Sequence, residues 1–137
     1  MKYFQFLFFY CKCIEYIEFK KFCRNNVTDM RSMFNCSSLK ELNLNNFNTN
    51  NVTDMSYMFN GCSSLKELNL NNFNTNYVIY MSGMFCGCSS LKELNLNNFN
   101  TNNVTYMSGM FSGCLDELKL KIKGQFKNFK DEAFVNY

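Results

Sequence analysis

Hydrophobic residues recur along this chain with a fixed period. The valine that opens each repeated stretch stands at Val27, Val52, Val78 and Val104, so the steps are 25, 26 and 26 residues. A period of this size is typical of repeat proteins, in which one unit buries its apolar face only by stacking on its neighbours. The pattern therefore predicts a solenoid of similar coils.

The first part of each unit has the spacing of a short helix. In the unit that begins at Asn51, apolar residues fall at i, i+3, i+6 and i+7, on one face of a helix: Val52, Met55, Met58 and Phe59. Asn51 suits the N-cap of this helix, and Gly61 suits its end.

The second part of each unit has the spacing of a strand. Leu65, Leu68 and Leu70 form the L-x-x-L-x-L pattern of leucine-rich repeats, with Asn69 pointing outward. The same frame occurs at Leu39/Leu42/Leu44, Leu91/Leu94/Leu96 and Leu115/Leu118/Leu120. We therefore expect an α/β repeat solenoid of the leucine-rich-repeat type. It has about five coils, a parallel β-sheet on one face and short helices on the other.

The ends of the chain depart from the repeat. An offset of 51 residues places Cys11 on Cys62 and Ile17 on Leu68, so residues 1–26 are interpreted as a degenerate N-terminal capping coil. A targeting segment is the alternative for this region. Its apolar run is at the low edge for a signal peptide and too short to span a membrane. The repeats follow as 27–51, 52–77, 78–103 and 104–123, and residues 124–137 form a C-terminal cap or tail. Within the last repeat, the apolar residues Leu118, Leu120 and Ile122 alternate with lysines over 118–123, which predicts a final edge strand.

Composition narrows the classes of function. The chain is 47% hydrophobic and 18% aromatic, which is enough for a packed core. Its net charge of +3 is too small to indicate a nucleic-acid partner. The absence of histidine removes the commonest general base and metal ligand. We therefore expect no enzyme, no cofactor and no metal site.

Eight cysteines recur partly in step with the repeat. One per coil forms a predicted ladder: Cys11, Cys36, Cys62, Cys88 and Cys114. Neighbouring members could reach disulfide distance, but buried cysteines also serve as small apolar residues, and the pattern favours reduced core thiols. Cys13, Cys23 and Cys86 lie outside the ladder, in spacings that do not match a zinc site.

Polar residues on the predicted strands form three rows across the coils. They are the candidate binding surface: Lys40, Glu41, Asn43, Lys66, Glu67, Asn69, Lys92, Glu93 and Asn95. The competing interpretation is a solvated face on which the lysine and glutamate rows offset each other.

The run from Val52 to Thr75 resembles the BspA-like leucine-rich-repeat surface proteins of bacteria. They share its V-T-x-M-x-x-M-F-x-x-C-x-x-L-x-x-L-x-L-x-x-F pattern. The resemblance implies a cell-surface or secreted adhesion module that binds a host or cell-surface protein without a cofactor. Because no convincing signal peptide is seen, a second hypothesis is a non-exported repeat fragment or an intracellular, cytoplasmic scaffold. End-to-end self-association through the coil edges is a further expectation.

Overall fold

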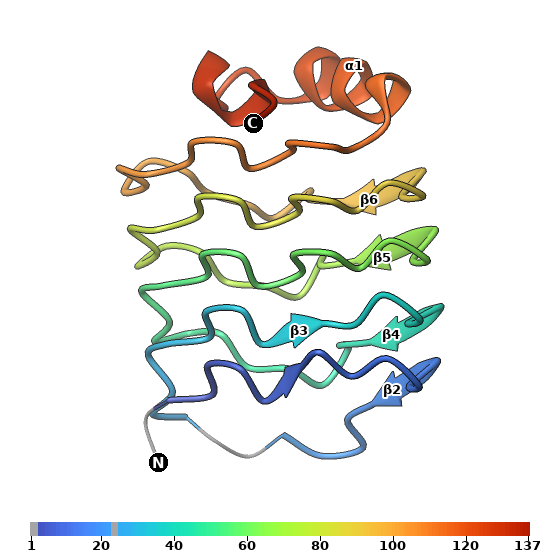
Figure 1. Cartoon of the computed structure of the whole chain (residues 1–137). Coiled ribbons are helices and arrows are strands. Elements are labelled where there is room, and N and C mark those ends of the chain that lie inside the picture. Colours follow the sequence, from blue (N-terminus) through green and yellow to red (C-terminus); the bar gives the residue numbers. More distant parts are fainter. Residues whose placement is uncertain (1–2, 23–24) are drawn as a thin grey trace.

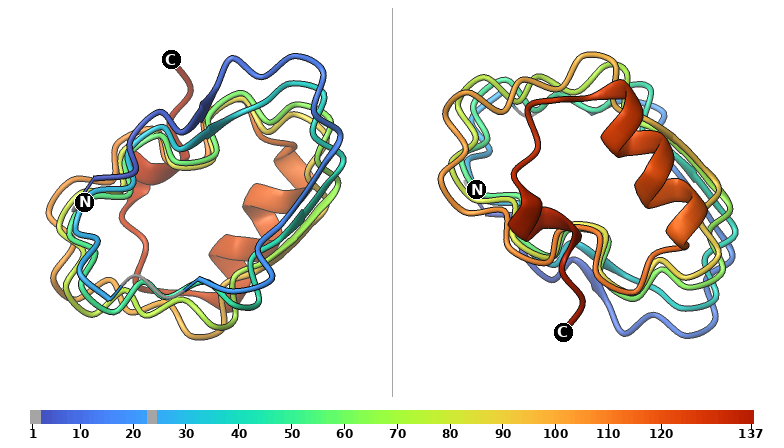
Figure 2. Two further views of the ribbon diagram at one scale, coloured as in Figure 1. Left: turned by 90° about the horizontal axis from the view of Figure 1, so that it is seen from below. Right: turned by 90° about the horizontal axis from the view of Figure 1, so that it is seen from above.

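The chain is stacked in layers. The computed structural model describes residues 3–22 and 25–137, most of which lie outside helices and strands. Successive segments lie above one another, with the N-terminus at one end and the helical C-terminal segment at the other (Figure 1). Seen along the stack, the layers follow one elongated ring (Figure 2). Residues one repeat apart therefore occupy equivalent places in neighbouring layers.

Short parallel strands line one long side of this ring. β2 (Tyr16–Glu18) pairs with β4 (Glu41–Asn43), and β5 (Glu67–Asn69) pairs with β6 (Glu93–Asn95). Leu68 stands opposite Leu94 in this register. Parallel strands at the leucine pattern are thus confirmed, although they form two-stranded sheets instead of one continuous sheet.

A second set of parallel pairings lies on the other side of the ring. There β1 (Phe8–Phe9) pairs with β3 (Phe34–Asn35). A row of single bridges joins equivalent residues of all the layers: Tyr3, Asp29, Asp54, Tyr80 and Tyr106.

The predicted short helices after each valine are wrong. The apolar residues of this stretch are buried as expected, but the backbone forms successive turns. The N–H of Met58 bonds the carbonyl of Met55, whereas the N–H of Phe59 bonds the carbonyl of Met84 in the next layer. Because alternate N–H groups are used between layers, the i→i−4 bonds of a helix do not form.

Phenylalanine rings run through the core as a continuous column. Neighbouring rings stack with centroids 5.1–5.6 Å apart, in the order Phe8, Phe34, Phe59, Phe85, Phe111 and Phe134. The four inner rings are completely buried. Stacked aromatic pairs add stabilisation beyond the burial of their area, so this column ties each layer to the next.

The last repeat ends in a helix, not in the predicted edge strand. α1 (Asp116–Gln125) buries Leu118 and Ile122, leaves Leu120 exposed and includes Gly124. The 3-10 helix η1 (Asp131–Phe134) follows and buries Ala133. Together they cover the end of the stack (Figure 1). Leu118 and Ile122 are four residues apart, which places both on one helix face towards the core.

Candidate functional site

A shallow groove of about 650 Å³ runs over the strand side of the layers. Seven of the nine sequence-predicted residues line it: Lys40, Glu41, Asn43, Glu67, Asn69, Glu93 and Asn95. Tyr16 and Gln125 extend it towards the two ends of the stack. Lys66 and Lys92 are exposed but are not part of its lining.

Charges in the groove are not balanced by neighbouring rows. Lys40 pairs with Glu15 at 3.2 Å, and Glu93 pairs with Lys121 of α1 at 3.2 Å. Over residues 3–22 and 25–137, no ion pair joins Lys66 or Lys92 to the glutamates beside them. The glutamates of successive layers therefore form an acidic row along the groove, about 4.8 Å apart where their strands pair.

The asparagines of the groove have a local structural task. The Oδ1 atom of Asn69 accepts the backbone N–H of Asn71 at 2.9 Å, and Asn43 and Asn95 make the same contact two residues ahead. Each bond closes a turn at the end of a strand. These side chains therefore shape the edge of the groove, and their acceptor oxygens are already engaged.

The neighbouring asparagine-rich turns join one layer to the next. The Nδ2 atom of Asn72 donates to the carbonyls of Leu44, Asn45 and Phe47 at 2.9–3.1 Å. The hydroxyl of Thr75 donates to the carbonyl of Asn100 and accepts the N–H of the same residue. The spacing of residues along the sequence does not reveal these inter-layer bonds, because it does not show where an amide points.

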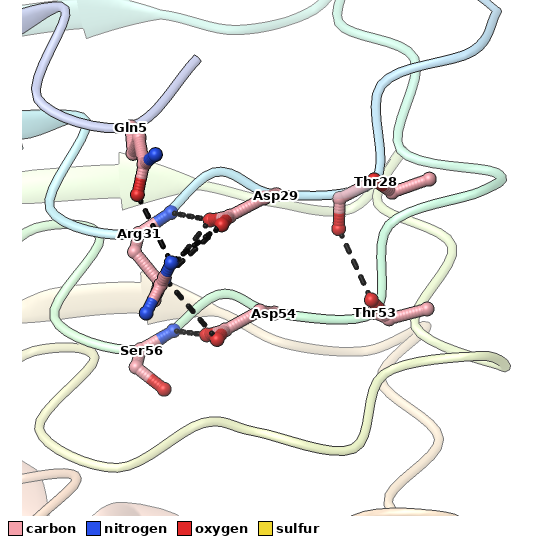
Figure 3. A network of polar contacts seen from close by, with 7 residues as sticks. All are labelled: Gln5, Thr28, Asp29, Arg31, Thr53, Asp54 and Ser56. Carbon is pink, nitrogen blue, oxygen red and sulfur yellow. Dashed lines mark hydrogen bonds and ion pairs between the residues drawn. The ribbon is translucent and has the colours of Figure 1, made fainter. Parts of the chain in front are cut away.

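A polar network on the opposite side of the ring was also missed (Figure 3). The guanidinium of Arg31 donates to both carboxylate oxygens of Asp29 at 2.8–3.2 Å, and its Nη2 atom donates to Gln5. Its Nε atom lies 3.4 Å from Asp54 in the next layer. Hydrogen bonding to Asp29 raises the pKa of Arg31. The side chain thus clamps three layers together, with its charge neutralised by two carboxylates.

Four cysteine thiols of the predicted ladder are buried and free: Cys36, Cys62, Cys88 and Cys114. Each Sγ atom donates to a backbone carbonyl of the preceding layer, as Cys62 does to Phe34 at 3.2 Å. Desolvation by burial raises the pKa of Cys62 to about 11 and that of Cys114 to about 12. Such thiols are protonated near neutral pH and therefore unreactive. Cys23 lies outside the described residues.

Residues 3–22 and 25–137 contain no group of three or more cysteine, aspartate or glutamate side chains arranged to hold a metal ion. None of the helices among them has the length and apolar character needed to cross a membrane.

Comparison with protein families places the chain in one family. Residues 2–124 match the family described as "Mycoplasma protein of unknown function, DUF285". The chain belongs to this family. The DUF285 match spans the thiol ladder, most of α1 and all the groove-lining residues except Gln125, so these features lie within the family's region. No curated protein and no solved structure shows a match. The resemblance to BspA-like proteins stays a prediction, because the DUF285 description names no function.

Proposed function

We propose that this DUF285 chain is a leucine-rich-repeat solenoid that acts as a non-catalytic protein-binding and adhesion module of the BspA-like type. The observation that carries the proposal is the groove on the strand side, which is lined by outward residues of four successive layers. A surface built from repeated layers presents the same groups at a regular spacing, which suits an extended partner.

The charge of the groove narrows the class of partner. Glu41, Glu67 and Glu93 line it together with a single lysine, Lys40, which pairs with Glu15 outside the lining. Glu93 pairs with Lys121 of α1, whereas Glu41 and Glu67 form no ion pair within the described residues. A row of carboxylates favours a ligand segment rich in lysine or arginine, because complementary charge raises the rate and specificity of association. The proposed partner is therefore a basic segment of a host or cell-surface protein.

Binding to poly-L-lysine, with poly-L-glutamate as the opposite probe, tests this function. The chain itself is basic overall, so binding of poly-L-lysine requires a locally acidic surface. The triple variant Glu41→Gln, Glu67→Gln, Glu93→Gln should bind poly-L-lysine roughly tenfold more weakly, since each exposed charge pair contributes up to about 1 kcal/mol.

A matched control has the same change in net charge away from the groove. It carries Glu117→Gln, Asp131→Asn and Glu132→Gln, all at exposed positions in α1 and η1. This control should bind like the unmodified chain. Equal losses in the two triple variants, or no binding by the unmodified chain, would reject the groove as the binding surface.

The second candidate is a non-exported repeat fragment or intracellular scaffold. The buried thiols favour it, because each is satisfied by a carbonyl and is compatible with the reducing cytosol. Cell fractionation with surface protease shaving separates the two hypotheses. Loss of the intact chain on shaving supports the adhesion module, and a chain that stays protected supports the scaffold.

A further inference from the structure

The two ends of the stack differ in how far their end layers are covered. At the C-terminal end, Gly109 and Phe111 donate their backbone N–H groups to the carbonyls of Glu132 and Ala133. α1 and η1 thereby take the place of a further layer (Figure 1). Phe111 is completely buried, and its ring stacks on that of Phe134 in η1 with centroids 5.1 Å apart. This end has no free row of backbone donors at these residues for another chain to pair with.

The N-terminal end is apolar and open. Six of the fourteen exposed large hydrophobic residues in the described chain lie within residues 3–16: Tyr3, Phe6, Leu7, Phe9, Tyr10 and Tyr16. Phe8 is only partly buried, although its equivalents in the next four layers are completely buried. A terminal repeat that faces water normally has a polar outer surface. The outer face of the first layer is therefore less polar than that of a typical terminal repeat.

Within residues 3–22 and 25–137, the outer edge of β2 has no strand partner. β2 pairs with β4, and the carbonyl of Glu15 accepts the N–H groups of Lys40 and Glu41. Successive residues of a strand direct their backbone groups to opposite edges, so the groups of Tyr16 and Glu18 point away from β4. Such an edge is a template for pairing with another strand.

This edge is self-complementary under a two-fold axis. An antiparallel pairing centred on Ile17 places Tyr16 of one copy opposite Glu18 of the other, so both exchange backbone hydrogen bonds. The reversed direction also brings Lys20 and Lys21 of one copy near Glu15 of its partner, but that carboxylate already lies 3.2 Å from Lys40 of its own chain. The complementarity of this edge therefore lies in its backbone groups.

We propose that the first layer is an interface and that two copies of this chain associate head to head through it. Pairing through the β2 edges forms an antiparallel junction and covers the apolar outer face of both first layers. On the opposite side of the ring, the equivalents of Tyr3, Gln5 and Leu7 in later layers accept bonds through their carbonyls. Two such rows of acceptors meet in the dimer and are bridged by water. The closed C-terminal end limits the assembly to a dimer.

Sedimentation of the reduced chain over a range of concentrations tests the proposal. The unmodified chain should be a dimer. Tyr16→Pro should shift it to monomer, because proline removes only the N–H that faces the open edge and is tolerated on an edge strand. Leu7→Lys should do the same by placing charge on the apolar end.

A matched control keeps the outcome interpretable. Leu120→Lys introduces the same charge on α1 at the other end, where the side chain is 70% exposed, and should remain dimeric. Circular dichroism should be unchanged in both N-terminal variants, and their melting temperatures should no longer depend on protein concentration, because the stability contributed by the partner is lost. A monomeric unmodified chain, open-ended polymers, or a dimer that only Leu120→Lys disrupts would overturn the proposal. None of these variants alters Glu41, Glu67 or Glu93, so failure here leaves the groove test intact.

Discussion

At the scale of single residues, the cysteine ladder shows how one position serves both packing and polarity. A thiol at this place is small enough for the core and still provides a donor for a carbonyl of the preceding layer. Alanine would leave those buried carbonyls without this partner. The ladder is therefore a set of inter-layer hydrogen bonds, and its contribution depends on the thiols staying protonated.

This dependence predicts a loss of stability at alkaline pH. Below about pH 8.5 the thiols are protonated in both the folded and the unfolded chain, so their contribution is complete. As the pH rises towards 11, the unfolded chain loses the Cys62 proton while the folded chain keeps it. The free energy of unfolding then falls by up to about 1.4 kcal/mol per pH unit for this thiol.

Urea denaturation between pH 8 and pH 11 measures the effect. Other groups titrate in this range, so the comparison is with Cys62→Ala, which lacks the Cys62 contribution and should show a shallower decline. Identical slopes in the two proteins would contradict the raised pKa of this thiol.

At the scale of elements, the segment that forms the helix α1 was predicted to be a strand, and the two structures bury different residues. In the strand expected from alternation, Leu118, Leu120 and Ile122 all face the core. In the helix, Ile122 is 1% exposed and Leu120 is 70% exposed. Ile122→Ala should therefore lower the free energy of unfolding by about 2–4 kcal/mol, whereas Leu120→Ala should change it by less than about 0.5 kcal/mol. Chemical denaturation of both variants measures this, and equal losses would favour the strand.

The periodicity predicted which residues are buried better than it predicted the backbone that carries them. Leu68, Phe59 and Cys62 are core residues as expected, because burial follows from apolar character at a fixed period. The helix from Val52 was wrong because inter-layer hydrogen bonds compete with helical ones, and spacing alone does not reveal that competition. The last strand was wrong because this segment satisfies its backbone groups within the helix α1, and alternation of apolar and charged residues does not reveal that alternative.

For the candidate site, the sequence predicted which residues face outward but not the contacts that their side chains make. Two-residue alternation identified the outward positions, and seven of them line the groove. The turn-closing role of Asn69 and the clamp made by Arg31 depend on side-chain direction across layers. Neither contact can be predicted from the spacing of residues along the sequence.

At the scale of the whole molecule, each layer is stabilised chiefly by the layers directly above and below it. The phenylalanine column illustrates this: Phe59 stacks on Phe34 and on Phe85, both at 5.6 Å, whereas Phe8 stacks along the column on Phe34 alone. In such an array stability approximates a sum over units and nearest-neighbour interfaces. An inner ring therefore contributes to two interfaces of the column and a terminal ring to one.

Substitution along this column tests the argument. Phe59→Leu should lower the free energy of unfolding by about 1–2 kcal/mol, because it removes two stacked contacts and leaves a small cavity. In the monomeric Leu7→Lys background the first layer faces water. There, Phe8→Leu should lower the free energy of unfolding by less than about half as much as Phe59→Leu does. Urea midpoints and slopes of the two variants measure the difference. If the costs were equal in that background, the first layer would be as tightly packed as the inner ones, which its partial exposure contradicts. If Phe8→Leu became costlier only in the chain that retains Leu7, the extra stability would come from a partner seated on the first layer.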